Sequence, residues 1–131
     1  MKNVKVAAAV ICDESRVLAT QRGYGEFNGM WEFPGGKIEI NETPEEALKR
    51  EVMEELDVKV RIEEPFCAVE YDYPTFHLSL TCFICSIVEG KLTLKEHKSA
   101  KWLSAEELDT VEWLPADAEI VMLLKEKLSA I

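Results

Sequence analysis

Three glutamates near the middle of the chain are the side chains whose type and spacing most clearly suggest chemistry. Glu51, Glu54 and Glu55 stand at positions i, i+3 and i+4, so a helix would place them on one face. Like charges at this spacing destabilise a helix, but a divalent cation bound between them would offset the repulsion. Three glutamates taken alone would more often be a solvated acidic face. The glycine pair at 35–36 and Arg50 beside them favour a site for Mg²⁺ or Mn²⁺.

The helix that carries these glutamates is predicted from Pro44 to about Leu56. Thr43 is a favourable N-cap, and proline suits the first helical position. Glu46 follows Thr43 by three residues, so the two can form a capping box. One face of this helix is apolar and would pack on a core, through Ala47, Leu48, Val52 and Leu56.

The stretch from Gly36 to Val58 resembles the Nudix box, G-x5-E-x7-R-E-U-x-E-E-x-G-U, in which U is a bulky apolar residue. Glu42 occupies the first glutamate of that pattern, and the run from Arg50 onward supplies the rest. The one departure is Asp57, which stands where the box has glycine. That glycine ends the helix in a left-handed conformation, which Asp tolerates better than most residues with a side chain. We therefore expect a small loss of stability and no loss of activity.

The remaining sequence predicts strands around a second helix. Strands are expected over 2–11, 17–21, 31–33, 66–71, 76–88 and 100–103, with 58–65 partly extended. A glycine-rich loop (22–29), a turn (34–36), a short helix opened by Ser104 and a last helix (116–128) complete the chain. No repeat or linker interrupts it, so residues 1–131 are interpreted as a single α/β domain with a mixed sheet between helices. The resemblance identifies this architecture as the Nudix α/β/α sandwich.

The likeness to MutT-like enzymes of this family extends past the box, through WEFPGGKIE, ETPEEA, EY-x-YP and LPAD. These enzymes hydrolyse nucleoside triphosphates to a monophosphate and pyrophosphate. The resemblance implies a Mg²⁺-dependent hydrolase, with Mn²⁺ as an alternative, acting on CTP, dCTP or 5-substituted dCTP. Its close rival is 8-oxo-dGTP hydrolysis, a form of DNA repair that clears the nucleotide pool. Hydrolysis of ADP-ribose or dinucleoside polyphosphates is less favoured, and a non-catalytic nucleotide-binding module would be expected to lack box carboxylates.

The resemblance also assigns metal ligands. Glu51, Glu54 and Glu55 would bind the divalent ions together with the Gly36 carbonyl. Glu51 would alternatively orient or deprotonate the attacking water. Glu96 matches a distant acidic residue of MutT-like enzymes, which adds a ligand or acts as the base; a solvated loop glutamate is nearly as good an interpretation of it.

Basic side chains are expected to support the carboxylates and the substrate. Arg50 would hold a box carboxylate in place, the alternative being an ordinary i,i+4 pair with Glu54. Glu42 is expected to brace its loop rather than perform chemistry. Arg22 and Lys37 lie nearest the glycine loops and would bind phosphates, although Lys37 could equally be a surface residue.

Three residues are candidates for base recognition. Phe33 and Phe76 could stack on a base, although core packing is the commoner role of a single aromatic residue. Asp117 follows Pro115 at a helix start, where it could simply cap the helix. By resemblance, 8-oxoguanine-specific enzymes carry Asn at this position, whereas Asp resembles the enzymes acting on CTP. An ionised carboxylate accepts hydrogen bonds and so suits the exocyclic amine of cytosine.

Composition limits the partners. The formal net charge of −10 argues against a nucleic acid polymer as partner, and favours an anionic nucleotide only if a cation mediates the contact. No apolar run reaches the roughly 18–20 residues of a membrane span, and no signal peptide is evident, so the cytoplasm is the expected location.

Cys82 and Cys85 lie in one predicted strand and would point to opposite faces as free thiols. A monomer or a homodimer is expected.

Overall fold

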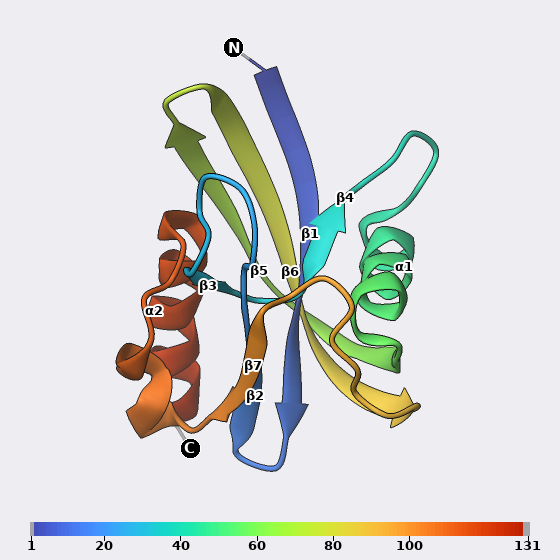
Figure 1. Cartoon of the computed structure of the whole chain (residues 1–131), viewed down its shortest axis with the longest axis vertical. Coiled ribbons are helices and arrows are strands. Elements are labelled where there is room, and N and C mark those ends of the chain that lie inside the picture. The colour runs from blue at the N-terminus through green and yellow to red at the C-terminus, as the bar shows by residue number, and fades with distance from the viewer. Residues whose placement is uncertain (1, 130–131) are drawn as a thin grey trace.

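The computed structural model describes residues 2–129. Its elements are β1 (Lys2–Asp13), β2 (Arg16–Gln21), β3 (Trp31–Glu32), β4 (Gly35–Lys37), α1 (Pro44–Leu56), β5 (Lys59–Tyr73), β6 (Phe76–Glu89), β7 (Ser99–Leu103), the 3₁₀ helix η1 (Ala105–Thr110) and α2 (Pro115–Ser129). The sheet runs β3-β2-β1-β6-β5, with β4 paired to β1 and β7 paired to β2. Helices α1 and α2 cover opposite sides of this sheet (Figure 1), which confirms the predicted α/β/α sandwich.

Strand β1 forms the centre of the sheet. It pairs in parallel with β6 and antiparallel with β2 and β4. Alternate side chains of β1 enter two separate cores: Ala8 and Val10 pack with α2, whereas Ala7, Ala9 and Ile11 pack with α1. Because both faces are covered there, this strand is continuously apolar from Val6 to Cys12 instead of alternating with polar residues.

Helix α1 begins and ends where its sequence predicts. The Glu46 N–H donates to Thr43 Oγ1 at 3.1 Å, and the Thr43 N–H donates to Glu46 Oε1 at 2.8 Å, which completes the capping box. The four predicted apolar residues of this helix are buried. Asp57 follows the helix with φ 59° and ψ 34°, and its N–H donates to Met53 O at 3.0 Å. The left-handed conformation expected at this position is therefore confirmed.

Two strands differ from the prediction. Strand β5 is one continuous element across Pro65, and register shifts at Ile62/Glu64 and Pro65/Cys67 accommodate the residue that cannot donate to the ladder. The predicted turn at 34–36 was wrong in part, because Gly35 and Gly36 begin β4. A Cβ on Gly35 would lie 2.0 Å from the carbonyl oxygen of Ala7, so this close pairing with β1 requires glycine.

The cysteines behave as predicted. Cys82 packs on the α2 side of the sheet and Cys85 on the α1 side, and all four cysteines are free thiols. Within residues 2–129, neither helix is long and apolar enough to cross a membrane.

Candidate functional site

A cavity of about 490 Å³ opens between the sheet, the start of α2 and the carboxylate face of α1. It brings together nearly all of the predicted site residues: Arg22, Phe33, Gly36, Lys37, Glu51, Glu55, Phe76, Glu96 and Asp117. Arg50 and Glu54 are the predicted site residues that do not line it. The cavity is acidic toward α1 and aromatic toward α2.

The acidic end is built where β4 runs against α1. A Cβ on Gly36 would lie 2.3 Å from the carboxyl carbon of Glu51, so the missing side chain is what lets this carboxylate reach the strand. Glu55 is only 7% exposed, and its Oε1 accepts a hydrogen bond from the Gly35 N–H at 3.3 Å. Burial and the nearby charges of Glu51, Glu32 and Glu96 raise the pKa of Glu55 to about 8. Carboxylates at this end therefore repel one another.

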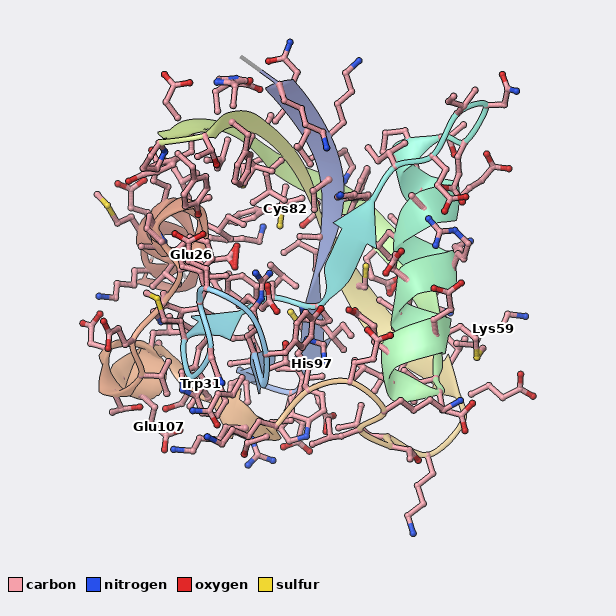
Figure 2. All side chains as sticks on the ribbon, turned by 45° about the horizontal axis from the view of Figure 1, so that its top comes forward. Glu26, Trp31, Lys59, Cys82, His97 and Glu107 are labelled. Carbon is pink, nitrogen blue, oxygen red and sulfur yellow. The ribbon has the colours of Figure 1, made fainter. Side chains whose placement is uncertain are left out.

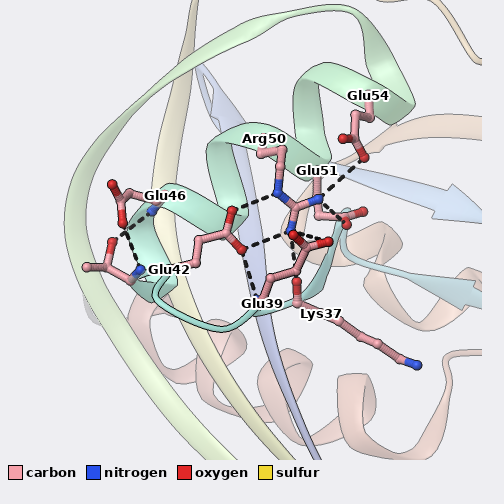
Figure 3. Close-up of polar contacts among 8 residues, drawn as sticks. Lys37, Glu39, Glu42, Glu46, Arg50, Glu51 and Glu54 are labelled. Atoms are coloured by element: carbon pink, nitrogen blue, oxygen red, sulfur yellow. Dashed lines mark hydrogen bonds and ion pairs between the residues drawn. The ribbon is translucent and has the colours of Figure 1, made fainter.

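Arg50 holds several carboxylates on the outer side of α1 (Figure 3). Its guanidinium donates to both oxygens of Glu42, at 2.7 and 2.9 Å, and to Glu51 Oε1 at 2.8 Å. A weaker contact of 3.4 Å reaches Glu54, whose side chain is 56% exposed. Another N–H donates to the Lys37 carbonyl at 3.0 Å. Arg50 thus holds Glu51 beside the cavity, whereas Glu54 lies outside the cavity lining.

Glu42 acts as a brace for the loop before α1. Besides its bonds to Arg50, its Oε1 accepts a hydrogen bond from the Glu39 N–H at 3.0 Å. The hydrogen bonds from Arg50 lower the pKa of Glu42 to about 2. This arrangement matches the structural part predicted for Glu42.

The chemistry of the acidic end fits a hard divalent cation. Carboxylate oxygens and the carbonyl of the Gly36 segment are oxygen donors of the kind that Mg²⁺ and Mn²⁺ prefer. A cation would also offset the repulsion that raises the pKa of Glu55. Among the residues that the structure describes, no group of three or more Asp, Glu, His or Cys side chains is arranged to hold a metal ion by itself. Mg²⁺ normally keeps water and phosphate oxygens in its coordination sphere, so substrate oxygens would complete the set of donors.

Glu32 is a member of the site that the sequence analysis missed. Its Oε1 accepts from Arg22 Nη2 at 2.6 Å, and its Oε2 lies 3.3 Å from Arg22 Nε and 3.4 Å from His97 Nε2. Burial alone would raise the pKa of Glu32, but the hydrogen bonds with His97 and Arg22 outweigh it and lower that pKa. A sequence feature could have identified Glu32: it is a charged residue between two aromatic residues, Trp31 and Phe33, in the short strand predicted over 31–33.

Aromatic side chains line the other end of the cavity. Phe33 is buried and stacks on Trp113, with ring centroids 4.7 Å apart, so core packing accounts for most of its surface. Phe76 is half-buried and stacks on Tyr73 at 4.9 Å, and Tyr73 meets Phe27 edge-on at 5.5 Å. The structure therefore offers Phe76 with Tyr73 and Phe27 as the apolar surface that a base could contact.

Asp117 lies in the first turn of α2 and faces the cavity, with only 7% of its surface exposed. Its carboxyl accepts a hydrogen bond from the Phe33 N–H, while burial and the charge of Glu32 hold its pKa well above the usual range. The sequence analysis treated this carboxyl as ionised. The structure instead places it where the ionised form is disfavoured, because a buried charge lacks the solvation that water would give it.

Comparisons with known proteins agree with this geometry. Residues 1–124 match the NUDIX domain family. The chain is 41% identical to an 8-oxo-dGTP diphosphatase of Proteus vulgaris, over 72% of this chain and 87% of the relative. It is 31% identical to a CTP pyrophosphohydrolase of Escherichia coli, over 92% and 90% of the two chains. The solution structure of the E. coli ORF135 protein superposes with a TM-score of 0.85 at 29% identity, covering 99% of this chain and 94% of that one.

Proposed function

This chain belongs to the Nudix family of hydrolases, and from that premise we propose that it is a Mg²⁺-dependent nucleoside triphosphate pyrophosphohydrolase. The reaction would convert a nucleoside triphosphate and water to a nucleoside monophosphate and pyrophosphate. One observation carries the proposal: a single cavity joins a carboxylate end, two basic side chains and an aromatic end that holds a buried carboxyl. These parts match the metal-bound phosphates and the base of a nucleotide.

The residues of the acidic end would have separate roles in metal binding and in proton transfer. Glu51, Glu55 and Glu96, with the Gly36 carbonyl, would hold the cation, and Glu54 would join them only by leaving Arg50. When bound, the cation would neutralise phosphate charge and lower the pKa of a water molecule. Glu51, fixed by Arg50 beside Gly36, and Glu96 are the candidates to accept the proton of the attacking water.

Arg22 and Lys37 would bind the phosphates. Arg22 enters the cavity already oriented by Glu32, and Lys37 lies directly after the glycine pair. The net charge of −10 supports a free nucleotide rather than a nucleic acid polymer as the partner. The nucleotide pool and the four free thiols support the cytoplasm as the place of action.

For the base, we propose that Asp117 makes the selective contact. As an ionised acceptor it would bind the exocyclic amine of cytosine, which favours CTP, dCTP or 5-substituted dCTP. The burial of Asp117 gives specific support to the second candidate, 8-oxo-dGTP. A protonated carboxyl can donate to the O6 acceptor of the oxidised guanine. Base choice would then depend on the protonation state of one side chain.

The test is a nucleotide panel with Mg²⁺, following the release of monophosphate and pyrophosphate. Activity should disappear with EDTA and return with Mg²⁺ or Mn²⁺, and Glu51→Gln should lower kcat by about 100-fold or more while the protein stays folded. Full activity in EDTA would refute the metal-dependent reaction. Products other than a monophosphate and pyrophosphate would refute the proposed bond cleavage.

The base assignment is tested by pH. The pKa of Asp117 is raised, so the carboxyl gains its proton as the pH falls through that value. The ratio of kcat/KM for dCTP to that for 8-oxo-dGTP should therefore rise by about tenfold as the pH is raised through that pKa. Any other titration of the protein that changes kcat/KM equally for the two nucleotides cancels in this ratio. Glu32, Arg22, Tyr73 and Cys82 lie close enough to influence this titration.

Asp117→Asn is the matched control, because an amide both donates and accepts but does not titrate in this range. It should remove the pH dependence of the ratio and shift preference toward 8-oxo-dGTP. The proposed role in base selection would be refuted if the ratio stays constant with pH in the wild-type protein and is unchanged by Asp117→Asn. Asp117 would then serve only to cap the helix.

A further inference from the structure

Glu32 joins two loops that approach the cavity from different parts of the chain. One loop, residues 22–30, carries Arg22; the other, residues 95–98, carries Glu96. The loops touch where a Cβ on Gly23 would lie 3.2 Å from Lys98 Cβ, so a side chain there would be tightly packed against the second loop. In the view of Figure 2, His97 lies between β3, which carries Glu32, and α1.

The second loop depends on few contacts for its position. The Lys95 N–H donates to Glu55 O at 3.0 Å, and the Lys98 N–H donates to Gln21 O at 2.9 Å. Between these two bonds the His97 ring is turned inward, with only 4% of its side chain exposed. Glu96, its neighbour, is exposed and contributes to the cavity lining. The orientation of the His97 ring therefore fixes the segment that presents Glu96.

Among the residues that the structure describes, the His97 ring has one polar partner. Its Nε2 lies 3.4 Å from Glu32 Oε2, whereas its buried Nδ1 has no hydrogen-bond partner among the described residues. Removing the Glu32 carboxylate would leave a buried imidazole with no polar contact from the protein, which is unfavourable. Both oxygens of Glu32 are already occupied by Arg22 and His97, so this carboxylate is poorly placed to bind a cation itself.

We propose that Glu32 is a positioning residue that sets the place of Glu96 through His97 and the place of the Arg22 guanidinium directly. The proposal rests on the proposed function for its catalytic consequence. Through His97 it affects the chemical step, because Glu96 must reach the reacting end of the substrate. Through Arg22 it affects substrate binding, because the guanidinium must meet the phosphates. The two effects can be separated by substitution.

The experiment uses the full chain with dCTP and 8-oxo-dGTP in Mg²⁺, and amide hydrogen exchange without nucleotide. His97→Phe keeps a buried ring but loses the contact, so kcat should fall about tenfold while KM changes by less than about twofold. Exchange over residues 95–98 should accelerate by about tenfold. His97→Gln places an amide N–H near the position of Nε2, so it should keep kcat and the exchange rate over residues 95–98 close to their wild-type values. Glu32→Gln, which weakens both contacts, should lower kcat and also raise KM by about fivefold.

His77→Phe is the matched control, since His77 also contacts two carboxylates, Asp72 and Glu70, but lies outside the cavity lining. It should leave kcat, KM and exchange over 95–98 unchanged. Wild-type kinetics and wild-type exchange in His97→Phe and Glu32→Gln would overturn the proposal, as would an equal loss in His77→Phe. If His97→Phe does not fold, Glu32→Gln and His97→Gln decide the question by the same measurements. If the wild-type protein hydrolyses neither nucleotide, the proposed function fails, and the exchange measurement still decides whether Glu32 holds the loop.

Discussion

Asp57→Gly tests whether the single departure from the Nudix box has only a conformational consequence. Asp57 has φ 59° and ψ 34°, and a residue with a Cβ pays about 1 kcal/mol in this conformation. Glycine would remove that cost but adds about 0.5 kcal/mol through the greater freedom of the unfolded chain. The contact between Asp57 Oδ1 and Lys95 Nζ, at 3.7 Å with both side chains half exposed, is worth about 0.3 kcal/mol at most.

Removing a negative charge from the C-terminal end of α1 offsets that last loss by about 0.3 kcal/mol. The sum predicts that Asp57→Gly raises the free energy of unfolding by about 0.5 kcal/mol, or the Tm by about 2 °C. Urea and thermal unfolding in EDTA measure this change. Asp57→Asn is the control, because it keeps a side chain that tolerates the left-handed region and removes only the charge; its stability should stay near wild type.

The kinetics decide whether Asp57 has a role of its own. Because Asp57 is not among the residues that line the cavity, kcat/KM in Asp57→Gly should stay within about twofold of wild type. A larger change at unaltered stability would refute the conformational explanation. It would point to Lys95, which adjoins Glu96, as the route by which Asp57 acts.

Three other substitutions test the acidic end of the cavity. Arg50→Lys cannot reproduce the two-pronged contact with Glu42 while also holding Glu51, so kcat should fall about tenfold or more with little change in KM, as steady-state kinetics would show. Glu55→Gln should stabilise the metal-free protein by roughly 2 kcal/mol in urea unfolding at neutral pH, because the carboxyl with its pKa raised to about 8 must take up a proton on folding and the amide need not, and should nevertheless lower kcat; a less stable variant would contradict the cost of burying this carboxyl. Gly36→Ala places a Cβ where the Glu51 carboxylate lies, so kcat should fall about 100-fold with the circular dichroism spectrum preserved, and an active variant would show that Glu51 is not needed there.

Some local features of this protein could be predicted from the sequence because they depend on interactions between residues that lie close together in the chain. The capping box of Thr43 and Glu46, the apolar stripe of α1 and the left-handed Asp57 all depend on neighbours within one or two helical turns. The resemblance to the box predicted Gly36, Glu51 and Glu55, which line the cavity, and also Arg50 and Glu54, which do not.

Tertiary structure alone decided features that depend on residues distant in sequence. The sequence could not show that Gly35 and Gly36 would pair with β1 as a strand, because that pairing is set by the Ala7 backbone. It also could not show that Glu54 lies outside the cavity lining, or that Glu32 meets both Arg22 and His97.

The protonation of Asp117 is the clearest example of this division. The sequence determined that a carboxyl stands at the start of the last helix, and an isolated carboxyl there would be ionised. Folding places it against the Phe33 backbone, near Glu32 and away from water, which raises its pKa. The residue type is therefore fixed by the sequence, whereas its charge depends on solvation and on neighbouring charges that only the folded chain brings together.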